Sequence, residues 1–115
     1  MFGGKIMNVR ECIDKSKDYI QENLTENLTL EELARVANMS KTYYTTIFKK
    51  GTGISLWEYI VSKRVEMAKA IIKKDNATML EIATKCGFNN TANFNRAFKK
   101  HTGKTPSQYR KDEQH

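Results

Sequence analysis

The sequence predicts an all-α protein made of two helix-turn-helix lobes joined by a long linker helix, with about seven helices in all. The first observation is an internal repeat, in which Thr29–Tyr59 is followed by a second copy at Thr78–Tyr109. The copies align at an offset of 49 residues at first and 50 residues later, which indicates two copies of one supersecondary unit. The second observation is four helix starts of capping-box form, in a chain with one proline and no alternating strand pattern.

The repeat and the helix starts together suggest how the chain is divided. We expect a flexible lead-in at residues 1–7, a first lobe at 8–54, the linker helix at 55–74, a second lobe at 75–111 and a tail at 112–115. The first lobe should open with an acidic helix at Val9–Asn23, before the repeat begins.

Each copy contains the parts of a helix-turn-helix in the expected order. A short helix is predicted at Leu30–Val36 and again at Met79–Lys85, because apolar residues follow helical spacing there. The turn comes at Asn38 in the first copy and at Gly87 in the second, two residue types that tolerate a left-handed backbone. A small alanine precedes each turn, where two helices must nearly touch. These features predict a homeodomain-like lobe in each copy.

The second helix of each unit is the one expected to enter the major groove of DNA. We predict it at Lys41–Lys50 in the first copy and at Asn90–His101 in the second, with aromatic residues such as Phe48 and Phe98 facing the core. The opposite side chains are then left to face bases. This set consists of Arg96, Asn95, Thr91, Ala92, Thr42, Tyr43, Thr45 and Thr46.

Among these residues Arg96 is the strongest candidate for a base contact, because its guanidinium matches guanine O6 and N7. A phosphate contact or a surface ion pair is the alternative for Arg96. Asn95 has the groups to recognise adenine, and Thr91 could meet a thymine methyl or a phosphate. The first-lobe threonines are short and weakly discriminating, which suggests methyl and water-mediated contacts. We therefore expect the second lobe to carry more of the hydrogen-bonding specificity.

The predicted linker helix has the length that two recognition helices require. Twenty residues span ~30 Å at 1.5 Å per residue, and helices in successive major grooves lie ~34 Å apart. Ala70 is expected on the apolar side of this helix, with Met67 and Ile71. Because the exposed faces of the two copies differ, the predicted DNA site is asymmetric.

Charge is distributed as a polyanionic partner would require. The formal net charge is +7, but residues 1–32 carry 4 basic and 7 acidic side chains, whereas residues 33–111 carry 16 basic and 4 acidic ones. Leu33–Trp57 and Ile82–Lys111 contain no acidic residue. Double-stranded DNA is the expected partner, and a merely solvated basic surface is the alternative. The expected phosphate contacts are Lys41, Lys49, Lys50, Asn90, Lys99, Lys100 and Lys104, with the remaining lysines solvated.

Other function classes find little support in the sequence. Two cysteines cannot form a disulfide framework or a thiolate metal site, and no arrangement typical of catalysis is present, so we expect neither an enzyme nor a cofactor. No apolar run reaches the length of a membrane span, and a cytoplasmic location is expected. An RNA-binding or protein-interaction helical module is the alternative function. It is disfavoured because the aromatic residues fall on core positions.

Residues Asn8–Arg110 resemble the DNA-binding domain of the AraC/XylS transcription regulators. The resemblance rests on EIATKCGFNNTANFNRAFKKHTGKTPSQYR at Glu81–Arg110, on LEELARVANMSKTYYTTIFKKGTGISLWEYI at Leu30–Ile60, and on the Arg64-x-x-x-Ala68 pattern. Leu56 departs from the family, which often has proline there. The resemblance implies a seven-helix, two-lobed domain that binds promoters, most often for activation, with RNA polymerase as a partner. An effector-binding or receiver domain is expected elsewhere in a longer protein, and a small stand-alone regulator is the alternative.

Overall fold

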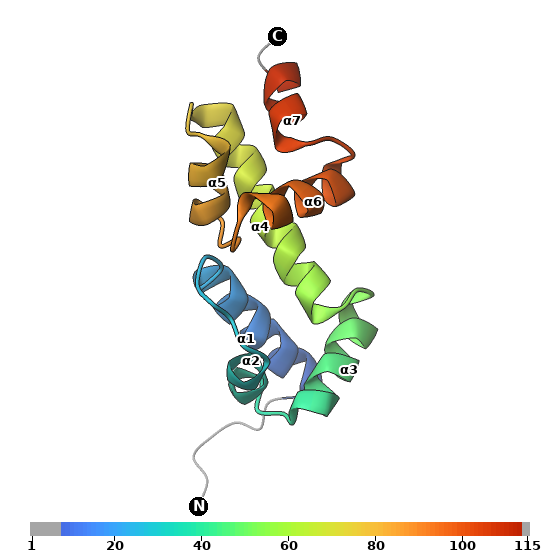
Figure 1. Ribbon diagram of the computed structural model, residues 1–115. Helices are drawn as coiled ribbons and strands as arrows, with labels where there is room; N and C mark the ends of the chain where they lie inside the picture. The colour runs from blue at the N-terminus through green and yellow to red at the C-terminus, as the bar shows by residue number, and fades with distance from the viewer. Residues whose placement is uncertain (1–7, 114–115) are drawn as a thin grey trace, which may run out of the picture. The chain divides into compact units, whose positions relative to one another are not determined.

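The computed structural model describes residues 8–113, and within them it contains seven α-helices and no strand (Figure 1). The helices are α1 (Val9–Glu22), α2 (Leu30–Val36), α3 (Lys41–Thr52), α4 (Leu56–Lys74), α5 (Met79–Lys85), α6 (Thr91–Thr102) and α7 (Pro106–Glu113). They form two compact units. Among the described residues, the first unit contains residues 8–23 and Leu28–Glu58, and the second contains Leu24–Asn27 and residues 59–113. The lead-in expected at 1–7 lies outside the described residues.

The predicted all-α class and helix order are confirmed, with small shifts at the helix ends. The recognition helices each run to a threonine, Thr52 in α3 and Thr102 in α6, before a glycine with a left-handed backbone ends them. Helix α6 begins at Thr91 because Asn90 caps it from outside. Helix α7 continues to Glu113, two residues into the segment expected to be a tail.

The helix starts follow the capping pattern, although only part of each box forms at some of them. At Thr78 the box is complete, because the Thr78 side chain accepts from the Glu81 N–H and the Thr78 N–H donates to the Glu81 carboxylate. At Thr29 the forward bond forms, but the Glu32 carboxylate accepts a bond from the Tyr19 hydroxyl of α1. A complete box at Asn8, which was not among the four predicted helix starts, opens α1.

The two turns share one backbone geometry. Asn38 has a φ of 59° and Gly87 a φ of 87°, so both adopt the left-handed conformation that their residue types favour. In each turn the next residue donates its N–H to the carbonyl of the buried alanine in the preceding helix, Ala34 in the first unit and Ala83 in the second, at 2.9 Å. The small alanine therefore sits at the point where the two helices approach.

In the first unit the core is formed by α1, α2 and α3. Ile20, Leu33 and Phe48 are completely buried, and Tyr44 stacks edge-on against Phe48 with ring centroids 5.8 Å apart. This packing fixes the rotation of α3, because Tyr44 and Phe48 lie one turn apart on its inner face. The opposite face of α3 is thereby turned to solvent.

The second unit repeats this core with phenylalanine. Phe94 and Phe98 are buried in α6 with ring centroids 5.7 Å apart, and Phe98 also meets Tyr109 of α7 at 5.3 Å. In α4 the expectation for Ala70 is wrong: this residue is exposed, and Val65 and Ala68 are buried instead. Val65, Ala68 and Ile72 form the inner stripe of α4, because this helix packs against the second core from its middle onward.

Arg64 of α4 anchors the Leu24–Asn27 segment within the second unit. Its Nε donates to the Leu24 carbonyl at 2.9 Å and its terminal nitrogen donates to the Glu26 carbonyl at 3.0 Å. Burial lowers the pKa of Arg64 from its ordinary value. The Cα of Gly87 lies against this anchor, since a Cβ at Gly87 would be 3.0 Å from Arg64 Nε and 3.2 Å from the Leu24 carbonyl oxygen. The turn of the second helix-turn-helix thus depends on a residue without a side chain.

Candidate nucleic-acid interface

The outer face of α3 places most of the predicted first-lobe residues in solvent. Thr42, Tyr43 and Thr46 are exposed, while Thr45 is half-buried at the edge of this face. Tyr43 is 48% exposed, so its ring belongs to the outer surface rather than to the core. The structure therefore groups these four side chains on the solvent-facing side of one helix, opposite the buried Tyr44 and Phe48.

The outer face of α6 carries the predicted second-lobe residues. Ala92, Asn95 and Arg96 are exposed, and Thr91 is half-buried at the start of the helix. Within residues 8–113 the Arg96 guanidinium makes no hydrogen bond or ion pair. A surface ion pair, which was one alternative for Arg96, is thus not formed with the described part of the chain. The five donors of the guanidinium face solvent.

The internal repeat puts the two faces in register. The buried pairs Tyr44/Phe94 and Phe48/Phe98 fix an offset of 50 residues, so Thr46 of α3 corresponds to Arg96 of α6. Both lie at the centre of the exposed side, two residues before the second buried aromatic ring. The same position of the recognition helix therefore carries the short Thr46 side chain in the first unit and the long, positively charged Arg96 side chain in the second.

The predicted phosphate-binding lysines fall into two groups. The first group is exposed and has no carboxylate partner within residues 8–113; it consists of Lys49, Lys50, Lys99 and Lys100. The second group is already paired, since Lys41 Nζ lies 3.5 Å from Glu31 and Lys104 Nζ lies 2.5 Å from Asp112. The hydrogen bond from Lys104 to Asp112 raises the pKa of Lys104. The paired lysines would have to exchange a carboxylate for a phosphate.

Asn90 has a local role in addition to the predicted phosphate contact. Its side-chain oxygen accepts the Asn93 N–H at 2.8 Å and so caps α6, as the Ser40 hydroxyl caps α3 by accepting the Tyr43 N–H at 3.2 Å. A contact from Asn90 to a phosphate would therefore use its amide nitrogen.

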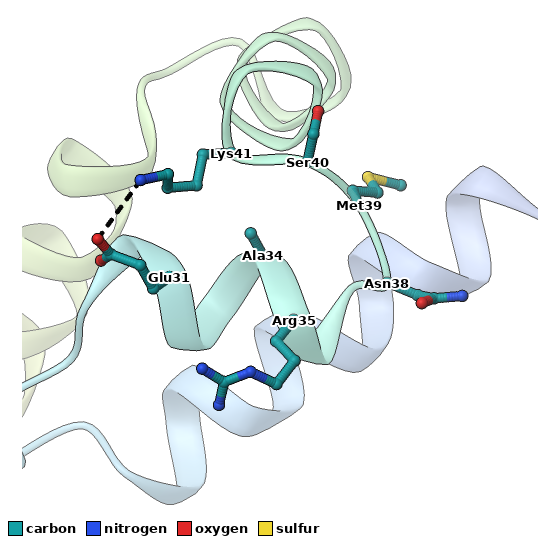
Figure 2. Close-up of a pocket in the computed structure, with 7 residues that line it drawn as sticks. All are labelled: Glu31, Ala34, Arg35, Asn38, Met39, Ser40 and Lys41. Carbon is teal, nitrogen blue, oxygen red and sulfur yellow. Dashed lines mark hydrogen bonds and ion pairs between the residues drawn. The ribbon is translucent and has the colours of Figure 1, made fainter.

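An open hollow of about 470 Å³ lies between α2 and the start of α3 (Figure 2). Glu31 and Lys41 face each other across it, and Ala34 points toward α3 between them. A backbone hydrogen bond at the helix start lowers the pKa of Glu31, and the nearby Lys41 ammonium lowers it further. Arg35 also lines the hollow, although the sequence patterns did not single it out. Its position in the last turn of α2, close to the tight turn, is the signal that could have identified it.

The described residues offer little material for other chemistry. Burial raises the pKa of the Cys86 thiol to about 11, which keeps it protonated and unreactive at neutral pH. Within residues 8–113 no group of three or more histidine, cysteine or carboxylate side chains could hold a metal ion. None of the described helices is long and apolar enough to cross a membrane.

Two helix-turn-helix motifs in one all-α chain, each with an exposed second helix, define the class as a tandem helix-turn-helix domain. A family model described as a helix-turn-helix domain matches residues 33–112. The bifunctional transcriptional activator/DNA repair enzyme AdaA of Bacillus subtilis is 41% identical over 100 residues, covering 87% of this chain and 47% of that protein. The Msm operon regulatory protein of Streptococcus mutans is 30% identical over 105 residues, covering 91% of this chain and 38% of that protein.

Solved structures agree with these relatives. The DNA-binding domain of AdpA, in complex with a target DNA, matches with a TM-score of 0.82 and 25% identity, covering 87% of this chain and 90% of that chain. The C-terminal domain of AraT, a response regulator from Geobacillus stearothermophilus, matches with a TM-score of 0.83 and 30% identity. The match covers 92% of this chain and 88% of that chain. The chain belongs to the AraC-type family of helix-turn-helix transcription regulators. It spans less than half the length of the two curated relatives named above.

Proposed function

We propose that this chain binds an asymmetric promoter site in double-stranded DNA, with α3 and α6 entering successive major grooves on one side of the duplex. The observation that carries the proposal is the difference between two faces built on one scaffold. Thr46 and Arg96 occupy equivalent positions, and they offer different chemistry to a base pair. Equal half-elements would not satisfy both faces, so the two half-elements of the DNA site differ in sequence.

Arg96 and Asn95 supply the direct readout in the second half-element. An arginine fork pairs with guanine O6 and N7, and an asparagine amide pairs with adenine N6 and N7. Both side chains are exposed on α6, one residue apart. Thr91 and Ala92 lie at the start of the same helix, where they contact the sugar-phosphate edge or a thymine methyl.

The lysines provide the sequence-independent part of the affinity. Lys49, Lys50, Lys99 and Lys100 bind phosphates flanking the two recognition helices, because they are exposed and without a carboxylate partner among residues 8–113. Arg35 and Lys41 border the hollow at the first turn, where a phosphate oxygen would compete with Glu31 for Lys41. Asn90 and Lys104 supply further phosphate contacts beside α6.

The role in the cell that fits this site is control of transcription in the cytoplasm, with activation and contact to RNA polymerase as the expected mode. Support for activation comes from a relative named as a transcriptional activator. We infer binding rather than catalysis, since the family model that matches residues 33–112 is a helix-turn-helix domain. The length shares of the relatives also support an effector-binding or receiver domain elsewhere in a longer protein.

Hydroxyl-radical footprinting on a duplex selected by the chain tests the geometry. We expect two unequal protected segments on one face, about 10 base pairs apart from centre to centre. A single protected segment, or two segments of the same sequence in inverted orientation, would contradict tandem binding to an asymmetric site. Competition with single-stranded and double-stranded RNA of the same sequence separates the alternative, because an RNA-binding module would prefer the RNA competitors. Transcription in vitro from a promoter carrying the site tests whether the effect is activation.

A further inference from the structure

Two threonine hydroxyls on the outer face of α3, those of Thr45 and Thr46, are already used by the helix itself. The Thr46 hydroxyl donates to the Thr42 carbonyl at 2.9 Å, and the Thr45 hydroxyl lies within 3.1 Å of the Lys41 carbonyl and 3.0 Å of the Thr42 carbonyl. A hydroxyl has only one proton to donate. Both side chains are therefore left with a methyl group and oxygen lone pairs for a partner in the groove.

Thr45 and Thr46 therefore cannot donate a hydrogen bond to the acceptors in the major groove. Guanine O6 and N7, adenine N7 and thymine O4 are all acceptors and need a donor from the protein. The oxygens of Thr45 and Thr46 can still accept from an adenine or cytosine amino group, and their methyl groups can take an apolar contact with the C5 methyl of thymine. Tyr43, three residues before Thr46 on the same helix and 48% exposed, adds apolar area beside it.

We propose that α3 selects thymine through methyl–methyl packing, with Thr46 as the central specificity-determining residue and Thr45 at its edge. The proposal rests on the proposed function, the binding of duplex DNA through α3 and α6. It assigns opposite modes of recognition to the two halves of the site. At the position equivalent to Thr46, Arg96 has its donors directed to solvent, so the second half-element is recognised by hydrogen bonds and the first by shape and methyl groups.

Substitutions at Thr46 separate the methyl from the hydroxyl. Thr46→Val keeps a branched apolar side chain and removes the hydroxyl, whereas Thr46→Ser keeps the hydroxyl and removes the methyl. The matched change in the DNA is uracil in place of thymine in the first half-element, which removes the C5 methyl alone. Binding is measured by fluorescence anisotropy on the duplex that the wild-type chain selects. Circular dichroism shows that each variant has kept its helices.

We expect that removing the thymine methyl and removing the Thr46 methyl weaken DNA binding by the same amount, and that the two losses do not add. Replacing the contacted thymine by uracil should weaken wild-type binding about fourfold, the effect of one methyl group removed from an apolar contact. Thr46→Val should bind the thymine duplex as well as the wild type does. Thr46→Ser should bind the thymine duplex about fourfold more weakly than the wild type does. It should bind the uracil duplex no more weakly than it binds the thymine duplex. Arg96→Ala serves as the control, because its loss should be the same on both duplexes.

Two results would overturn the proposal. If uracil substitution has no effect at any position of the first half-element, methyl recognition is absent. If Thr46→Val loses binding while Thr46→Ser retains it, the hydroxyl recognises the base, for example by accepting from an adenine or cytosine amino group. Failure of the proposed function looks different, since the wild-type chain would then select no duplex sequence at all and both proposals would fall together.

Discussion

Thr46 and Arg96 occupy the same position in two copies of one helix-turn-helix, each two residues before a completely buried phenylalanine. The duplication therefore preserved the packing of the recognition helix and changed what it presents. Phe48 and Phe98 hold the two helices in the same rotation, so the outward position is fixed even where its side chain differs. This relationship underlies the asymmetric site that we propose.

The unpaired lysines should set the salt dependence of DNA binding. Replacing Lys99 by alanine removes one phosphate contact and should lower the slope of log affinity against log salt by ~0.9. The loss should be uniform across DNA sequences, because a phosphate contact carries no base information. Lys15→Ala is the matched control, since Lys15 is exposed on the acidic α1. An equal change in slope for both variants would contradict the assignment of Lys99.

Gly87 should be far less tolerant of a side chain than Gly103 in the same unit. Both have a left-handed backbone, with φ of 87° and 84°, so alanine costs ~1–2 kcal/mol at either position. Only at Gly87 would the added Cβ also meet Arg64 Nε at 3.0 Å and the Leu24 carbonyl oxygen at 3.2 Å, whereas the space around Gly103 is open. Urea denaturation of Gly87→Ala and Gly103→Ala measures the difference. Equal losses of stability would show that the close approach at Gly87 has no energetic consequence.

The Arg64 anchor should contribute to the stability of the second unit. Arg64→Met keeps most of the apolar stem and removes both hydrogen bonds to the Leu24 and Glu26 carbonyls. We expect a loss of ~1–3 kcal/mol in the free energy of unfolding, since hydrogen bonds from a charged group are lost. Lys69→Met on the same helix removes only an exposed ion pair with Glu66 and should cost less than ~0.5 kcal/mol. If the two variants are equally stable, the anchor is not a stabilising contact.

The capping box at Thr78 should make α5 sensitive to acid. The backbone hydrogen bond from Thr78, followed by the bond between their side chains, lowers the pKa of Glu81 from its ordinary value of 4.5. Because the folded-state pKa is the lower one, the stabilisation is present above pH 4.5 and is lost as the pH falls through the folded-state pKa. Glu81→Gln should remove this component.

Hydrogen exchange of the α5 amides between pH 6 and pH 3 gives the measurement for Glu81. Protection corrected for the intrinsic exchange rate should fall with pH in the wild type and fall less in Glu81→Gln. Glu22→Gln, at the exposed end of α1, is the control and should follow the wild type in α5. If the protection of the α5 amides depends on acid in Glu81→Gln as it does in the wild type, the capping box is not the source of that dependence.

Much of the fold could be predicted because its determinants are local. The left-handed positions Asn38 and Gly87, and the glycine ends of α3 and α6, each follow from one residue type in one conformation. Because the chain contains the unit twice, a pattern found in one copy could be checked against the same position in the other. The stripe of α4 was harder, since its inner face is decided by tertiary packing against the second core, which left Ala70 exposed.

The candidate site was predictable as a set of positions but not as a set of contacts. Lys41 and Lys104 are paired with carboxylates ten and eight residues away, a pairing that depends on how successive elements pack. Arg64 reaches a carbonyl 40 residues earlier in the chain, which no local pattern indicates. The donor direction of Thr46 is a choice of rotamer, and threonine in a helix has two to choose from. The contacts of these residues with DNA stay predictions.

The most direct measurement is selection of binding sites from random duplex DNA by the 115-residue chain, repeated with Arg96→Ala. We predict an asymmetric site of two half-elements about one helical turn apart. In Arg96→Ala the preference for guanine should be lost at one position of one half-element, by ~1–3 kcal/mol, with the other half-element unchanged. Enrichment of no sequence, of a single short element, or of a palindrome would contradict tandem recognition by two different faces.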